Sequence, residues 1–137
     1  SRSTQSLDLI GLGLRTVPAE VCMLSSLTRL SFTDNQLHEL PPAIGRLVGL
    51  TDLSLVDNCL SSLPPELGRL TNLTSLSVAY NELETLPVEL GRLDRLEELT
   101  LDGNYDIRSP PKEIISGGVH EILSYLKALL RAGGNGT

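Results

Sequence analysis

The residues best suited to catalysis or metal binding are few and far apart in this 137-residue sequence. Histidine serves as a general base and cysteine as a nucleophile or metal ligand, and the only ones present are His38, His120, Cys22 and Cys59. Cys59 and His38 together supply at most two ligands, whereas a zinc site needs three or four. No CxxC pair or glycine-rich phosphate loop occurs. We therefore expect no enzymatic activity, no cofactor and no metal.

The charge balance narrows the classes of partner. Lys and Arg total 11 and Asp and Glu total 17, which gives a formal net charge of −6. Nucleic acids and anionic membranes attract basic surfaces, so neither is an expected partner. No run approaches the roughly 18 apolar residues of a membrane span. The few cysteines and the lack of a signal-like segment predict a cytoplasmic location.

The elements that would position any functional group come from a repeat. Identical residue types recur every 23 positions, in the series Leu27, Leu50, Leu73, Leu96, then Leu30, Leu53, Leu76, Leu99, and then Asn35, Asn58, Asn81, Asn104. Units starting near 27, 50 and 73 are nearly identical. Degenerate units start near 4, with Leu12 in place of Asn, and near 96, with one residue inserted around 105–107. We therefore divide the chain into five repeats over residues 4–118.

These units resemble the leucine-rich repeat pattern LxxLxLxxNxLxxLPxxIGxLxx over more than four-fifths of the chain. The Leu-Pro steps at Leu40, Leu63 and Leu86 and the Gly-Arg-Leu segments are similar to those of the cytoplasmic Ras-group-related class. The resemblance implies an α/β solenoid with a curved parallel sheet on its concave face and short helical or 3₁₀ turns on its convex face. It also suggests a small GTPase or its regulator as a partner.

The residue types of one unit fit this architecture on physical grounds. Alternation at LxLxx predicts a short strand that points Leu53 and Leu55 inward and Asp52, Ser54 and Val56 outward. An asparagine just after the strand can satisfy backbone groups of its own and the neighbouring turn. One proline per unit then blocks a long helix, at Pro18, Pro41, Pro64, Pro87 and Pro110.

The two ends of the array differ. At the C-terminal end, residues 119–131 form an amphipathic pattern that predicts a capping helix, with a membrane or partner helix as the alternative, and residues 132–137 predict a flexible tail. Only three residues precede the first repeat. We consider three explanations for the uncovered sheet edge at this end. The polar residues of the first repeat blunt the edge, or the chain is cut from a longer protein. Alternatively, the chain is not a monomer, and two copies form a weak homodimer through their N-terminal edges.

Function in a repeat protein normally lies on the outward strand positions, because packing leaves their side chains free to vary. Six acids fall there or at the following turn, against one base. We predict a protein-binding face whose members are Arg29, Asp34, Asp52, Val56, Asp57, Tyr80, Glu98, Asp102 and Tyr105. Tyr80 is the best anchor, because aromatic residues dominate interface energies.

The sequence thus predicts a non-enzymatic scaffold or adaptor that binds a basic or mixed protein or peptide surface through an acidic, Ser/Thr-rich concave face. One alternative is a substrate-recognition segment of a larger enzyme or effector, such as a ubiquitin ligase, a kinase or a bacterial effector. Another is a structural spacer.

Overall fold

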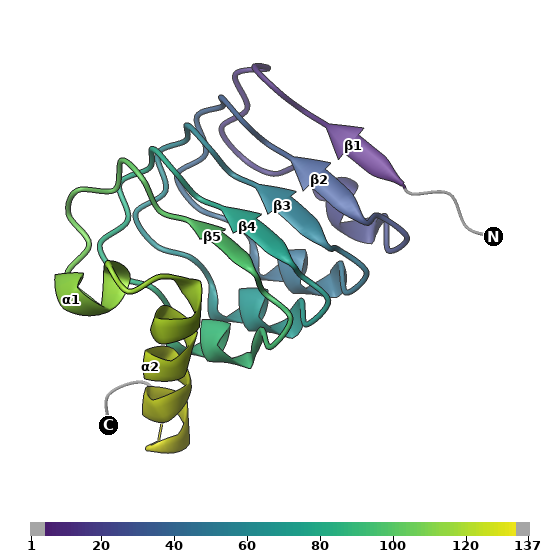
Figure 1. Cartoon of the computed structure of the whole chain (residues 1–137). Helices are drawn as coiled ribbons and strands as arrows, with labels where there is room; N and C mark the ends of the chain where they lie inside the picture. Colours follow the sequence, from purple (N-terminus) through teal and green to yellow (C-terminus); the bar gives the residue numbers. More distant parts are fainter. Residues whose placement is uncertain (1–4, 134–137) are drawn as a thin grey trace.

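The computed structural model describes residues 5–133 and consists of five stacked repeats (Figure 1). Each repeat contributes one three-residue strand to a single parallel sheet whose strand order follows the chain. The strands are β1 (Ser6–Asp8), β2 (Arg29–Ser31), β3 (Asp52–Ser54), β4 (Ser75–Ser77) and β5 (Glu98–Thr100). Successive strands pair 23 residues apart, so that the middle leucines Leu7, Leu30, Leu53, Leu76 and Leu99 align in one row. The predicted solenoid is confirmed.

Short 3₁₀ helices return the chain on the side opposite the sheet. They are η1 (Val21–Met23), η2 (Pro42–Arg46), η3 (Pro65–Arg69) and η4 (Val88–Arg92). Each of the last three follows an extended proline at its N-cap, which fixes where the helix begins. The turns pack closely through glycine: a Cβ added at Gly68 would lie 2.5 Å from the backbone oxygen of Glu89 in the next repeat. Only glycine fits at that distance.

The core between the sheet and the 3₁₀ helices is a stack of leucine layers. Leu37, Leu47, Leu50 and Leu55 are among the residues with no solvent exposure. The residues 23 positions later, Leu60, Leu70, Leu73 and Val78, are equally buried. A strand of three residues buries too little alone, so each layer is stabilised by the layers on both sides.

A ladder of buried asparagines joins the repeats beside this core. The Oδ1 atom of Asn58 accepts a hydrogen bond from the Leu37 amide at 3.0 Å, and its Nδ2 donates to the Phe32 and Leu55 carbonyls at 3.0 and 3.1 Å. Asn35, Asn81 and Asn104 make equivalent bonds. The side chain therefore satisfies backbone groups in two repeats at once.

The fifth repeat contains the inserted residue. Asn104 keeps the 23-residue spacing, but the Arg108 amide donates to Glu84 O at 2.9 Å and Thr85 pairs with Ser109, both 24 residues apart. The insertion therefore lies at 105–107, as predicted. The assignment of Pro110 as the repeat proline before the turn was wrong. Pro111 holds that place, as the extended N-cap of α1 (Lys112–Ile115), and Pro110 is buried.

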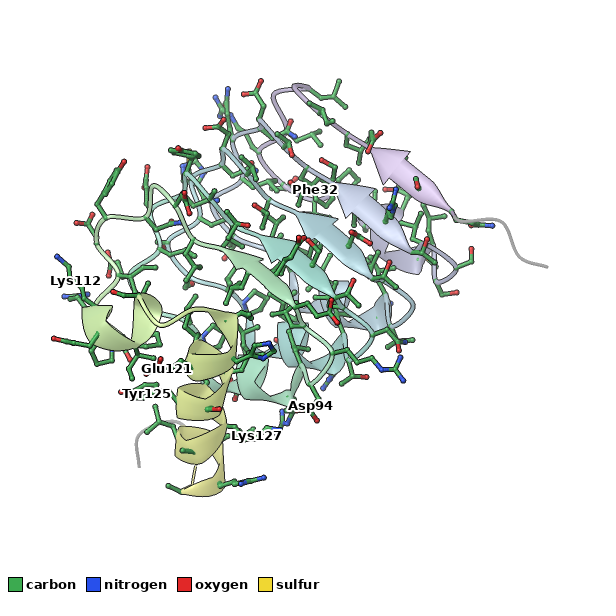
Figure 2. The ribbon with its side chains drawn as sticks, viewed as in Figure 1. Phe32, Asp94, Lys112, Glu121, Tyr125 and Lys127 are labelled. Carbon is green, nitrogen blue, oxygen red and sulfur yellow. The ribbon has the colours of Figure 1, made fainter. Side chains whose placement is uncertain are left out.

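The C-terminal helix α2 (Val119–Arg131) packs against η4 and α1, and Ile122, Leu123 and Leu126 are its buried residues (Figure 1). Figure 2 shows Lys127 beside Asp94, with which it forms an ion pair across this contact. A Cβ at Gly91 would lie 2.7 Å from the Lys127 amide nitrogen, so η4 and α2 touch backbone to backbone. The predicted C-terminal cap is thus present. The predicted tail falls mostly on residues 134–137, outside the described part of the chain.

At the other end of the array, β1 pairs only with β2 among the described residues. Four large apolar side chains there are exposed: Ile10, Leu12, Met23 and Leu24. Leu12 is 59% exposed and stands where the later repeats have their buried asparagine. No described element covers this first layer as α2 covers the last one.

Candidate protein-binding face

The outward side chains of the five strands form two rows, which we call the concave face. One row is Ser6, Arg29, Asp52, Ser75 and Glu98, and the other is Asp8, Ser31, Ser54, Ser77 and Thr100. The middle leucine of each strand lies between its two outward residues and is buried in β2 to β4 and partly buried in β1 and β5. Packing therefore fixes the leucine and leaves the outward pair free to vary.

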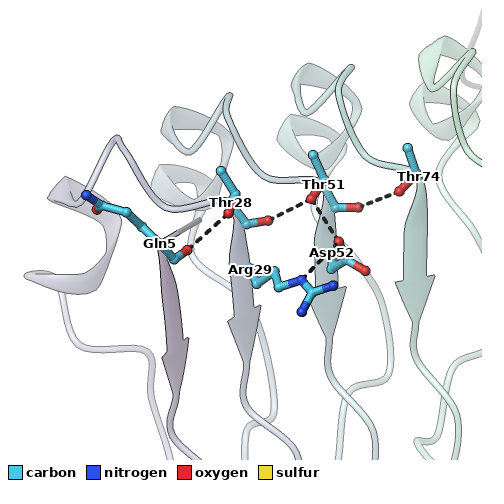
Figure 3. Close-up of polar contacts among 6 residues, drawn as sticks. All are labelled: Gln5, Thr28, Arg29, Thr51, Asp52 and Thr74. Carbon is cyan, nitrogen blue, oxygen red and sulfur yellow. Dashed lines mark hydrogen bonds and ion pairs between the residues drawn. The ribbon is translucent and has the colours of Figure 1, made fainter. Parts of the chain in front are cut away.

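Asp52 and Arg29 of the first row are brought together by the sheet. Arg29 Nε lies 3.7 Å from Asp52 Oδ1, and the Thr51 hydroxyl lies 2.8 Å from the same carboxylate oxygen (Figure 3). Thr28, Thr51 and Thr74 form a ladder in which each hydroxyl reaches the carbonyl one repeat earlier, at 3.1–3.2 Å. The single Thr51 hydrogen is shared between the ladder and Asp52. Asp52 is therefore oriented, and its charge is partly offset by Arg29.

Small hydroxyl side chains occupy the centre of the concave face. The Thr33 hydroxyl lies 3.0 Å from the Ser31 oxygen and 2.8 Å from the Ser54 oxygen. These short side chains leave an open hollow of about 360 Å³, bordered by Asp8, Arg29, Asp52 and the serines of β2 to β4. Its walls are hydroxyl groups and charges over a leucine floor, which suits polar side chains of a protein surface.

A third row lies where the chain leaves each strand, and we call it the turn row. It consists of Gly11, Asp34, Asp57, Tyr80 and Gly103, all in the left-handed backbone region with φ between 57° and 82°. Gly and Asp adopt this region readily, whereas a bulky residue is strained in it. The sequence prediction placed Asp34, Asp57 and Tyr80 on the face but missed this shared backbone conformation, which the glycines at both ends of the row indicate.

The structure separates the predicted site residues into two groups and one residue, Tyr105, that lies apart from both. Arg29, Asp52 and Glu98 lie on the concave face, while Asp34, Asp57 and Tyr80 lie in the turn row, with Val56 and Asp102 one residue before it. Tyr105 lies in the inserted loop, 84% exposed, and borders an open hollow of about 400 Å³ together with Glu84 and Arg108, which pair at 2.9 Å.

Ion pairing leaves most of the predicted acids unneutralised. Among residues 5–133 the ion pairs are Arg29–Asp52, Arg108–Glu84 and Lys127–Asp94. Five of the six acids counted on the strand and turn positions therefore lack an ion-pair partner in that part of the chain: Asp8, Asp34, Asp57, Glu98 and Asp102.

The residues that could do chemistry lie away from this face. His38 is exposed in the loop between β2 and η2, and His120 is exposed on α2. No group of three His, Cys, Asp or Glu side chains within residues 5–133 could hold a metal ion. Cys22 is buried, which raises the pKa of its thiol, while nearby Arg46 acts in the opposite direction.

No helix among the described residues has the length and apolar character needed to cross a membrane.

Two family models, both described as leucine-rich repeat, match residues 26–47 and 48–105, together more than half of the chain. The chain belongs to the leucine-rich repeat family. A leucine-rich repeat protein of Leptospira interrogans is 34% identical with a TM-score of 0.55, and the match covers 72% of this chain and 31% of that one. The functional domain of InlJ from Listeria monocytogenes, which includes a cysteine ladder, shares the fold at 23% identity and a TM-score of 0.60.

This leucine-rich repeat chain is short beside those neighbours. The InlJ match covers 69% of this chain but only 19% of that structure, so both neighbours extend well beyond the matched region. No curated protein sequence matches the chain significantly. Leucine-rich repeat domains generally serve as protein–protein interaction modules, and that general role follows from the family.

Proposed function

We propose that the chain is a non-enzymatic scaffold or adaptor that binds a basic or mixed protein surface on its concave face. The observation that carries this proposal is the set of five unpaired acids along the strands and turns, beside a sheet lined by Ser and Thr. Complementary charge steers a basic partner to the face and fixes its orientation.

The size of the face limits its affinity. Five strands spaced about 4.8 Å apart span about 20 Å, and the outward residues add about 13 Å along the strands. The resulting patch is smaller than the roughly 800 Å² per partner of a standard interface. We therefore propose weak binding by the concave face alone, strengthened by contacts with the turn row and Tyr105.

Capture from the native cytosol tests the proposal. The wild-type chain is expected to retain a partner that is lost at raised salt, because screening weakens charge attraction. Asp8→Lys/Glu98→Lys reverses two unpaired charges of the concave face, and Tyr80→Ala/Asp57→Ala removes two turn-row side chains. Both are expected to weaken capture, while circular dichroism shows that the variants remain folded.

A matched control removes two exposed acids elsewhere, as Glu20→Ala/Glu39→Ala. Equal capture by the control and by both face variants would contradict the proposal. Absence of any captured protein favours the structural spacer. A captured substrate of a ubiquitin ligase, kinase or effector favours the recognition segment of a larger enzyme. We propose a cytoplasmic location. On family resemblance alone, a small GTPase or its regulator is tested as a defined partner in the same assay.

The exposed first layer supports a weak homodimer as a second proposal. Ile10, Leu12, Met23 and Leu24 are apolar and open to solvent, and β1 has a free edge among the described residues. Sedimentation at rising concentration is expected to show a dimer that Leu12→Glu abolishes, because a buried unpaired charge opposes association. A monomer at every concentration would dispose of this proposal without affecting the first.

A further inference from the structure

Tyr80 is the exceptional member of the turn row. Its φ is 57°, where the other repeats have Gly or Asp, yet its side chain remains 53% exposed. A bulky residue is strained in this region, and the other repeats form the same turn without an aromatic ring. Neither local conformation nor core packing therefore accounts for a tyrosine at this position.

The Tyr80 ring occupies a notch made by a glycine. A Cβ added at Gly103 would lie 2.3 Å from Tyr80 Cδ1 and 2.8 Å from Tyr80 Cε1, so the ring rests directly on the Gly103 backbone of the next repeat. This contact limits the positions open to the ring. The rest of the ring is left open to solvent in a fixed place, which is the arrangement of an aromatic platform.

An aspartate of each neighbouring repeat lies next to the Tyr80 backbone. The Tyr80 amide donates to the Asp102 carbonyl at 2.7 Å, and the Asp57 amide donates to the carbonyl of Ala79 at 3.0 Å. Asp57 and Asp102 therefore lie about one strand spacing, about 4.8 Å, to either side of Tyr80. Both are exposed, and neither has an ion-pair partner within residues 5–133. Tyr80 thus has, in each neighbouring repeat, an exposed aspartate without an ion pair among the described residues.

We propose that Tyr80, Asp57 and Asp102 form a subsite for an arginine side chain of the protein partner. A guanidinium group stacks on an aromatic face and donates its N–H groups to carboxylates in a fixed planar fork. Lysine offers a compact, strongly hydrated charge and fits the platform less well. This subsite rests on the proposed function, because the arginine belongs to a protein held at the concave face.

An NMR titration of the whole chain with Nα-acetyl-arginine methylamide tests the subsite directly. Saturable shifts are expected at the amides of Tyr80, Asp102 and Gly103, with weaker shifts from the lysine analogue and none from the uncharged citrulline analogue. Tyr80→Leu is expected to weaken arginine binding about three-fold, whereas Tyr80→Phe retains it. Tyr105→Leu, a matched change in the more exposed neighbouring tyrosine, is expected to leave it unchanged.

The subsite is overturned if no saturable shift appears at these amides, if citrulline shifts them equally, or if Tyr80→Leu binds arginine as well as the wild type does. These results are separable from failure of the proposed function. Capture that is lost in Asp8→Lys/Glu98→Lys but kept in Tyr80→Leu refutes the subsite alone. Arginine binding at Tyr80 without capture of any protein refutes the proposed function alone.

Discussion

Replacing Asn58 by alanine tests how much the buried asparagine ladder contributes to the free energy of unfolding. The side chain is only 7% exposed, accepts from the Leu37 amide, and donates to the carbonyls of Phe32, Leu55 and, at 3.3 Å, Val56. Alanine removes all of these bonds and leaves the backbone groups buried. The question is how many of those groups lose their only partner.

The neighbouring rungs of the ladder answer it. The Phe32 carbonyl also accepts from Asn35 at 2.8 Å, and the Leu55 carbonyl also accepts from Asn81 at 2.8 Å, so each keeps one side-chain donor. The Leu37 amide has no second acceptor among the hydrogen bonds of the described residues. The Val56 carbonyl keeps the Asp34 amide at 2.9 Å and loses only the longest of the Asn58 bonds, so its contribution is small. One orphaned donor costs about 2 kcal/mol and the weakened Phe32 and Leu55 carbonyls about 0.5 kcal/mol each, so we expect a loss of about 3 kcal/mol.

Urea unfolding followed by circular dichroism measures this loss. With a slope of about 2 kcal/mol per molar urea, the midpoint should fall by about 1.5 M. Asn72→Ala is the matched control. Asn72 also bonds both neighbouring repeats, at Val48 O and at Arg95, but its bonds are exposed and should contribute less than about 1 kcal/mol. Equal losses in the two variants would refute the view that burial makes the ladder strong.

Two further predictions concern packing and thiol chemistry. Gly91→Ala should lower the free energy of unfolding by about 1–3 kcal/mol, because the added Cβ meets the Lys127 backbone at 2.7 Å. Gly49→Ala is the control and should cost less, because its Cβ would lie 3.3 Å or more from neighbouring atoms. Equal urea midpoints for the two variants would contradict this prediction. At pH 8 iodoacetamide should label half-buried Cys59 and spare native Cys22, whose pKa is raised by burial; equal labelling in mass spectrometry would contradict it.

Most of the fold could be predicted because its determinants repeat. A strand of three residues carries almost no periodicity by itself, but five strands in register report the same pattern at one spacing. The 23-residue interval also leaves too little chain for a long helix, and the proline before each of η2 to η4 marks where the turn begins. The repeat pattern located the insertion at 105–107, but the 23-residue spacing was still used beyond it, so the proline was assigned to Pro110 and not to Pro111.

Less of the candidate site could be predicted. Spacing alone identifies the outward residues, but it cannot tell which charges neutralise each other, and Arg29 pairs with Asp52 only because the parallel register sets them in adjacent strands. The backbone conformation of the turn row was missed as well. Two aspartates and two glycines at one repeat position indicate a left-handed residue, and the tyrosine in the same row is informative only once that is recognised.

Under the proposed function, stability and recognition depend on different residues, and Tyr80 belongs to both sets. Leucines, asparagines and glycines hold the layers together, so the concave face can change its charges without changing the fold. Tyr80 departs from this division, because its backbone is strained while its ring packs on Gly103. A residue that costs conformational energy and still exposes half of its side chain is better explained by contact with a partner than by folding. The turn row, beside the acidic sheet, is therefore the part of the molecule where partner specificity should be sought.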